Sequence, residues 1–171
     1  MLDYLVLYHS QTGNTKKIAV KIFESLSGNS KDLVNLDDCE QIPEARIYFV
    51  GFCVKHGTCN MKIIDVLGEL SGKQVALFGT CGMGKDVQYY KSIEDKVKVW
   101  LEDDNGYLGI FLCQGKMPIQ IREKYTAMPD REQVRKFLHN FDEAMTHPDE
   151  TDLKNAEDFV NRIVMRHLTD L

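Results

Sequence analysis

Four short, unbroken apolar runs constrain most strongly what this chain can fold into. They cover residues 4–8, 47–52, 75–78 and 107–112, and residues 32–36 form a weaker fifth candidate. Runs that are rich in Val, Ile, Leu and aromatic residues, and that do not alternate with polar ones, are typical of parallel strands covered on both faces. The sequence therefore predicts a buried parallel sheet of five strands.

The segments between these runs carry apolar residues at helical spacing. The predicted stripes are Ile18, Ile22 and Leu26; Ile63, Leu67 and Leu70; Tyr90, Ile93, Val97 and Trp100; and, near the end of the chain, Ala156, Val160, Ile163 and Val164. Alternation of strands with helices predicts an α/β fold, a doubly wound open sheet with helices on both faces. Trp100 lies on one stripe, so we expect it in the core.

Residues 114–150 interrupt this rhythm, because a connection in such a sheet usually takes only about 2 to 6 residues. The segment is not featureless. Val134, Phe137, Leu138, Phe141 and Met145 fall on one helical face, behind a Pro129 suited to a first turn. We interpret it as an excursion of two short helices within a single domain that spans residues 1–171.

The composition excludes several classes of function. With 171 residues, 43% of them apolar, the chain is sized for one hydrophobic core. A net charge of −5 without clustered Lys or Arg argues against a nucleic-acid partner. No apolar stretch approaches the roughly 20 residues that span a membrane, and the N-terminus resembles a strand more than a signal peptide. We therefore expect a cytoplasmic protein without membrane insertion.

The five cysteines are odd in number, spread out and never in a CxxC pair. This pattern favours reduced thiols over a disulfide framework or a zinc site. The acidic stretch 102–106 is interpreted as a helix end and turn, so no metal site is predicted. Cys53 and Cys81 are interpreted as buried, inert thiols, the commoner state of such cysteines.

The loops that follow the strands are the places for chemistry, because ligands of open parallel sheets bind beyond the carboxyl ends of the strands. The first loop, HSQTGNT, crowds Ser10, Thr12, Asn14 and Thr15 at the start of a helix. Their neutral donors, together with the helix N-terminus, suit an anion. The loop lacks both GK[ST] and GxGxxG, so a terminal monophosphate fits better than a longer phosphate chain. Lys16 and Lys17 are expected to face solvent.

The stretch LVLY, followed by Ser10-x-Thr12-Gly13-Asn14-Thr15 and Ala19, resembles the phosphate-loop signature of flavodoxins, which bind FMN noncovalently. The resemblance covers roughly residues 1–114 and implies the flavodoxin-like strand order 2-1-3-4-5, with FMN at the point where the order reverses. The later segments CQGKM and HPDETDLKNAEDF are similar to a branch of flavodoxin-like proteins from anaerobic bacteria that includes the proposed partner of bilirubin reductase.

The resemblance implies a set of cofactor-binding residues. The phosphate would be held by Ser10, Gln11, Thr12, Gly13, Asn14 and Thr15, and the flavin ring would be flanked by Cys53, Val54, Lys55, His56, Gly57, Thr58, Thr80, Cys81, Gly82, Met83 and Gly84. In flavodoxins a peptide beside a glycine in the first of these loops can flip toward the flavin, and Gly57 is the candidate here. Both loops lack the Trp or Tyr that usually stacks on the flavin ring. The stacking side chain is then His56, Met83 or Tyr89, or the stacking is weak. Lys55 and His56 would favour the anionic reduced flavin, so we expect a less negative second potential than in a typical flavodoxin.

Two functions are favoured, and a flavin-binding regulatory module is a third option. One is an electron carrier that uses FMN between redox partner proteins, and the other is an NAD(P)H-dependent FMN oxidoreductase acting on a quinone or another small acceptor. No second nucleotide motif follows any strand, which favours the carrier. The excursion could serve as a surface for a partner, as a lid or as the interface of a homodimer.

Overall fold

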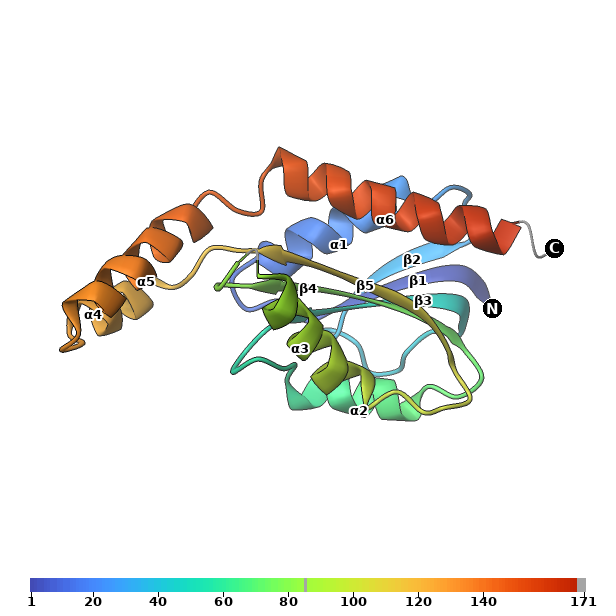
Figure 1. The fold of residues 1–171 in the computed structure, drawn as a ribbon. Coiled ribbons are helices and arrows are strands. Elements are labelled where there is room, and N and C mark those ends of the chain that lie inside the picture. Colours follow the sequence, from blue (N-terminus) through green and yellow to red (C-terminus); the bar gives the residue numbers. More distant parts are fainter. Residues whose placement is uncertain (85, 169–171) are drawn as a thin grey trace.

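The computed structural model describes residues 1–84 and 86–168, whose core is a five-stranded parallel sheet (Figure 1). The strands are β1 (Leu2–Tyr8), β2 (Lys31–Asn35), β3 (Ala45–Cys53), β4 (Gln74–Cys81) and β5 (Gly106–Gln114). The helices are α1 (Asn14–Ser25), α2 (Met61–Glu69), α3 (Val87–Lys98), α4 (Ile119–Thr126), α5 (Arg131–Ala144) and α6 (Glu150–Leu168). The sheet order is β2-β1-β3-β4-β5, which confirms the predicted flavodoxin-like topology.

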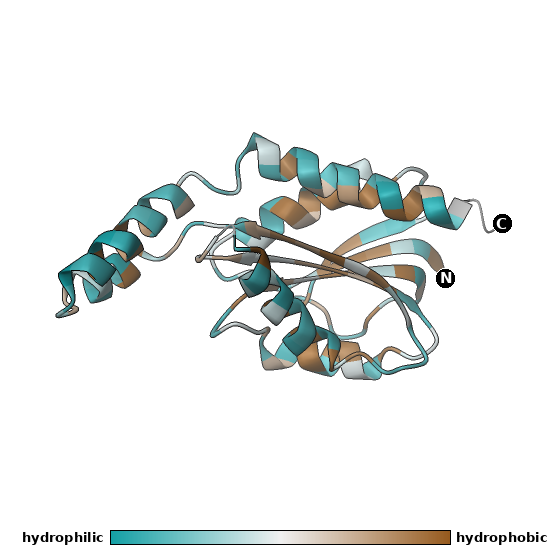
Figure 2. Cartoon of the chain, viewed as in Figure 1, coloured by the Kyte–Doolittle hydropathy of each residue, from teal (hydrophilic) through white to brown (hydrophobic). Residues whose placement is uncertain are grey.

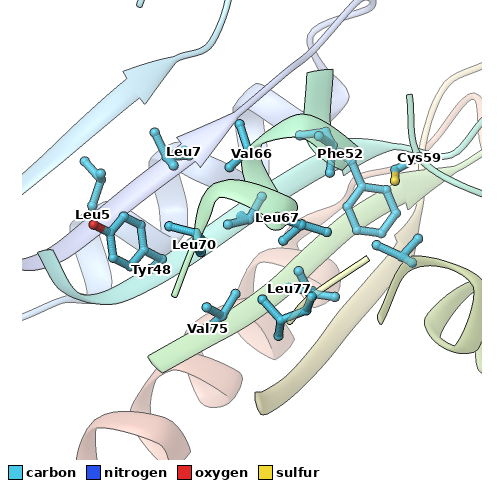
Figure 3. Packing of buried hydrophobic residues seen from close by; sticks show 14 of the residues in the cluster. Leu5, Leu7, Tyr48, Phe52, Cys59, Val66, Leu67, Leu70, Val75 and Leu77 are labelled. Atoms are coloured by element: carbon cyan, nitrogen blue, oxygen red, sulfur yellow. The ribbon is translucent and has the colours of Figure 1, made fainter. Parts of the chain in front are cut away.

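Helices cover both faces of the sheet, with α1 and α6 on one side and α2 and α3 on the other (Figure 1). The side chains of successive residues of β1 point to opposite faces of the sheet. Leu5 and Leu7 belong to the buried cluster that includes residues of α2 and α3, and Figure 3 shows them with labelled residues of α2. Val6 and Tyr8 belong to the cluster on the side of α1 and α6. Both faces of the strand are buried, which explains why its apolar run does not alternate with polar residues.

The excursion contains the two predicted short helices, α4 and α5, which extend away from the sheet beyond the carboxyl ends of its strands (Figure 1). Val134 and Phe141 are buried, and Phe137 stacks on Tyr125 of α4 at 4.8 Å between ring centroids. Asp130 caps α5, so Pro129 precedes the cap rather than occupying the first turn. In the view of Figure 2 the outer surface of α4 and α5 is mainly hydrophilic.

The prediction that Trp100 lies in the core is wrong, because its side chain is 46% exposed. Helix α3 ends at Lys98, two residues before the tryptophan, so the helical periodicity no longer applies there. Ile93 and Val97, earlier on the same stripe, are fully buried as predicted. Over residues 1–84 and 86–168, no helix is both long and apolar enough to cross a membrane.

Candidate cofactor site

The loops after β1, β3, β4 and β5 meet at one edge of the sheet, because parallel strands end on the same side. β1 lies between β2 and β3, so the chain crosses over in opposite directions from it, and this is where the strand order reverses. The structure thus brings the predicted phosphate loop to the same edge as the segments after β3 and β4.

The phosphate loop, residues 10–15, ends in a helix N-terminus that no side chain caps. Gly13 is the N-cap residue of α1 and has a φ of 86°, a left-handed conformation that favours glycine. The N-termini of α2, α3 and α5 are capped by the side chains of Asn60, Asp86 and Asp130, whereas α4, which follows Pro118, also has no side-chain cap. The first N–H groups of α1 therefore remain available for an anionic ligand.

The polar side chains of this loop divide into two groups. Ser10, Gln11 and Thr12 lie on the outer part of the loop, where Ser10 Oγ accepts a hydrogen bond from Gly13 N at 3.1 Å. Asn14 and Thr15 are buried and hold the loop from behind. This division suggests that the outer residues contact a phosphate while the inner ones fix the loop.

The inner residues bond to distant segments of the chain. Asn14 Nδ2 donates to Thr12 Oγ1 and to Lys116 O, both at 2.9 Å. The hydroxyl of Thr15 pairs with that of Thr80, at the end of β4, at 2.9 Å. Thr80 therefore contacts the phosphate loop, although the sequence comparison placed it beside the flavin ring.

The segment after β3 forms a tight turn at residues 55–58. Lys55 and Thr58 exchange two backbone hydrogen bonds of 2.9 and 3.2 Å. The two central residues, His56 and Gly57, have φ angles of 53° and 77°. Two successive positive φ angles are typical of a type I′ turn. Glycine adopts this conformation without strain, whereas histidine is strained in it.

We expect His56→Asn to stabilise the apoprotein by up to about 1 kcal/mol, because asparagine tolerates the left-handed conformation better than histidine. Urea unfolding monitored by circular dichroism would measure this gain. His56→Ala removes the same imidazole without supplying a residue suited to positive φ, so it serves as the control and should not stabilise. Equal stability of the two variants would contradict the assignment of strain to His56.

The segment after β4 contains a thiol that is held in its neutral form. Cys81 is 3% exposed, and its Sγ donates to Met83 O at 2.8 Å. Burial raises the pKa of Cys81 to about 12, and burial also raises the pKa of Cys53. Cys81 is thus buried as the sequence predicted, whereas Cys53 is only half-buried. Within residues 80–84, Met83 exposes a large apolar side chain.

Side chains that sequence reasoning missed surround these loops. His9, at the end of β1, is buried and its Nδ1 lies 2.8 Å from Asn60 Nδ2, which links the first loop to the start of α2. Met117 fills the space beside Gly82, where a Cβ would come within 2.5 Å of its Sδ. Burial raises the pKa of Tyr89, as do the nearby Cys81 and Tyr125. Tyr89, which the sequence had already offered as a stacking candidate, lies in the first turn of α3, shortly after the second flavin loop.

The two ends of the excursion are joined at its base, next to the phosphate loop. Lys116 N donates to His147 O at 3.1 Å, and Lys17 Nζ on α1 donates to Pro148 O at 2.7 Å. Lys17 therefore binds the returning chain instead of only facing solvent as expected. The excursion starts from a defined position relative to the loop that precedes α1.

One group of possible metal ligands lies at this base: His147, Asp149 and Asp152. The two aspartates cap α6 reciprocally, with Asp149 N donating to Asp152 Oδ2 and Asp152 N to Asp149 Oδ1, both at 2.9 Å. His147 Nδ1 lies 2.5 Å from Asp152 Oδ2. These hydrogen bonds explain why the three side chains lie together: they form the start of helix α6.

The residues present fit FMN. An uncapped helix N-terminus behind outer hydroxyl groups suits its monophosphate, and glycines at positions 57, 82 and 84 allow backbone to approach a flat ring. A parallel sheet in the order 2-1-3-4-5, with such a loop at its reversal point, defines a flavodoxin-like flavoprotein. The family model described as Flavodoxin domain matches residues 5–161; the chain belongs to the flavodoxin family, and its cofactor is FMN.

Two relatives cover almost the whole chain. The flavodoxin-like domain-containing protein BilS of Clostridioides difficile (strain CD3) is 35% identical over 95% of this chain and 96% of its own length. BilS of Clostridium symbiosum (strain WAL-14163) is 30% identical over 93% of this chain and 94% of its own. Similarity at this coverage includes the excursion as well as the sheet.

Solved structures share the fold at low sequence identity. The flavodoxin of Streptococcus pneumoniae TIGR4 is 16% identical, with a TM-score of 0.58 over 95% of this chain and 98% of that chain. The flavodiiron core of Flv1 from Synechocystis sp. PCC6803 is 15% identical, with a TM-score of 0.53 over 96% of this chain but 36% of that one. Both likenesses support the fold alone.

Proposed function

We propose that this protein carries electrons between redox partner proteins on its bound FMN. The uncapped N-terminus of α1 at the reversal point of the sheet is the observation that supports this most directly, because it suits the phosphate of a resident flavin. Bound flavin supplies one- and two-electron chemistry, while the chain binds it, orients it and adjusts its potential. Residues 10–15, 53–58 and 80–84 are the proposed contacts.

Two features favour a carrier over an enzyme with its own small substrate. No second nucleotide motif follows any strand of the sequence. Helices α4 and α5 extend from the cofactor edge, where Ile119 and Met145 expose apolar side chains that a partner protein could cover. The compartment is a separate point: all five cysteines are free, which supports a reducing compartment such as the cytoplasm.

The expectation of a less negative second potential stays a prediction, with one further charge in its support. Lys96 Nζ of α3 lies 3.3 Å from the position that a Cβ of Gly57 would take. Together with Lys55, it places two ammonium groups around the 55–58 turn. Positive charge beside a flavin favours its anionic reduced form.

The function is tested by anaerobic reduction of the holoprotein, followed at the visible absorbance of oxidised flavin. We expect NADH or NADPH alone to leave the flavin oxidised for minutes, whereas NADPH with a catalytic amount of ferredoxin–NADP⁺ reductase reduces it. Dithionite serves as the control that the flavin can be reduced. Rapid reduction by NADPH alone would contradict the carrier and support the NAD(P)H-dependent oxidoreductase, in which the excursion would cover a substrate above the flavin.

A further inference from the structure

Helix α5 of the excursion reaches back to the proposed flavin segment at residues 82–84 through one side chain, Asn140. Its Nδ2 donates to Gly82 O at 3.1 Å, and its Oδ1 accepts from Gly84 N at 3.4 Å. The same Nδ2 lies 3.4 Å from Met83 Sδ. One amide thus binds the backbone on both sides of Met83, 58 and 56 positions away along the chain.

A second amide, that of Gln114, supports the first from the end of β5. Gln114 is 2% exposed, and its Nε2 donates to Gly82 O at 3.0 Å and to Asn140 Oδ1 at 3.1 Å. A Cβ on Gly84 would come within 2.5 Å of Gln114 Oε1, so a side chain at position 84 would displace the Gln114 amide. The Gly82 carbonyl therefore receives hydrogen bonds from two side chains on different elements.

The oxygen of the Gln114 side chain, Oε1, is buried and has no hydrogen-bond partner among residues 1–84 and 86–168. A buried acceptor without a donor is unfavourable, and such atoms are rare in folded proteins. Gln114 Oε1 is the only such side-chain atom in the part of the chain that the structure describes. It lies beside Gly84, within the proposed flavin segment.

The position of Asn140 is itself fixed by packing. Val134, Phe141 and Ala144 on the same helix are buried, and Asp130 caps its N-terminus by accepting from two backbone N–H groups. The base of the excursion is held by the bonds from Lys116 N to His147 O and from Lys17 Nζ to Pro148 O. A helix anchored in this way can hold a loop in a defined place.

We propose that Asn140 is a positioning residue for FMN: it fixes the backbone of Gly82–Gly84 in the geometry that receives the flavin ring. The proposal rests on the assignment of this segment to the flavin within the proposed function. It makes the excursion a structural part of the cofactor site, in addition to any role as a surface for a partner. A movement of α5 would then change how tightly the flavin is held.

The test compares Asn140→Ala with His139→Ala, which removes an exposed side chain from the adjacent position of the same helix. Apoprotein of each variant is titrated with FMN by fluorescence quenching, and the visible circular dichroism of the bound flavin is recorded. We expect Asn140→Ala to weaken FMN binding about tenfold, since it removes two neutral hydrogen bonds to the segment. It should also change the visible circular dichroism, whereas His139→Ala should match the wild type.

Asn140→Asp is a second, nearly isosteric variant that keeps the acceptor for Gly84 N but loses the donor to Gly82 O, so it should also weaken FMN binding. If the alanine variant does not fold, the same FMN titration is carried out on Asn140→Asp. Unchanged FMN affinity and visible circular dichroism in the variant that folds would overturn the proposal, even if its thermal stability falls. That outcome leaves the anaerobic NADPH result untouched, so failure of the positioning role and failure of the carrier function are distinguishable.

Discussion

Replacing Thr12 with aspartate is expected to weaken FMN binding by about 100-fold or more. Thr12 lies on the exposed, outer part of the loop that precedes the uncapped N-terminus of α1. A carboxylate there would face the phosphate, and two like charges about 5 Å apart near a protein surface repel by roughly 3 kcal/mol. Titration of the apoprotein with FMN at low ionic strength measures the loss.

Riboflavin, which lacks the phosphate, separates this repulsion from damage to the ring site. The Thr12→Asp variant should bind riboflavin about as well as the wild type does. Ser27→Asp adds the same charge at an exposed position beyond the other end of α1 and should leave FMN binding unchanged. If FMN and riboflavin were weakened equally, residues 10–15 would not be the phosphate site.

Replacing Gly51 with alanine should destabilise the apoprotein by about 3 kcal/mol, at the upper end of the usual cost of overpacking a core. Gly51 lies in the middle of β3, and a methyl group built on it would overlap the ring of Phe78 on the neighbouring strand β4. Phe78 is fully buried, so its ring has no free space to enter. Urea unfolding of the apoprotein gives the free energy.

Two further variants show whether the overlap is the cause. Phe78→Leu in the Gly51→Ala background should recover more than 1 kcal/mol relative to the sum of the single effects, because the two residues are in contact. Gly68→Ala makes the same chemical change in α2, where a Cβ would meet nothing within 4 Å, and should stabilise by about 0.5 to 1 kcal/mol. A Gly51→Ala protein as stable as the wild type would contradict the predicted overlap.

The sheet could be predicted from sequence because both of its faces are buried. A strand such as β1 then needs apolar side chains at successive positions of its buried part, residues 5–8, and this requirement is visible as an unbroken run. The same reasoning failed at Trp100, where periodicity was extended past the true end of α3 at Lys98. Local pattern identifies the type of an element better than its last residue.

The position of the proposed phosphate loop at the start of α1 could also be predicted, because all of its parts lie within six consecutive residues, 10–15. The supports behind it could not. Thr15 pairs with Thr80 across 65 positions, and Asn14 binds the carbonyl of Lys116 across 102. Such partners are chosen by how the strands are ordered, and nothing local in the chain marks them.

The sequence by itself determined the class of fold and predicted a place for the phosphate, since both follow from local patterns of burial and hydrogen-bonding groups. Only the tertiary structure decided what surrounds the proposed flavin segment. Asn140 and Gln114 lie 58 and 32 positions from Gly82, and they meet there because β4 and β5 are neighbours and the excursion returns to the same edge. Contacts of this kind depend on chain topology, which a residue-by-residue pattern does not contain.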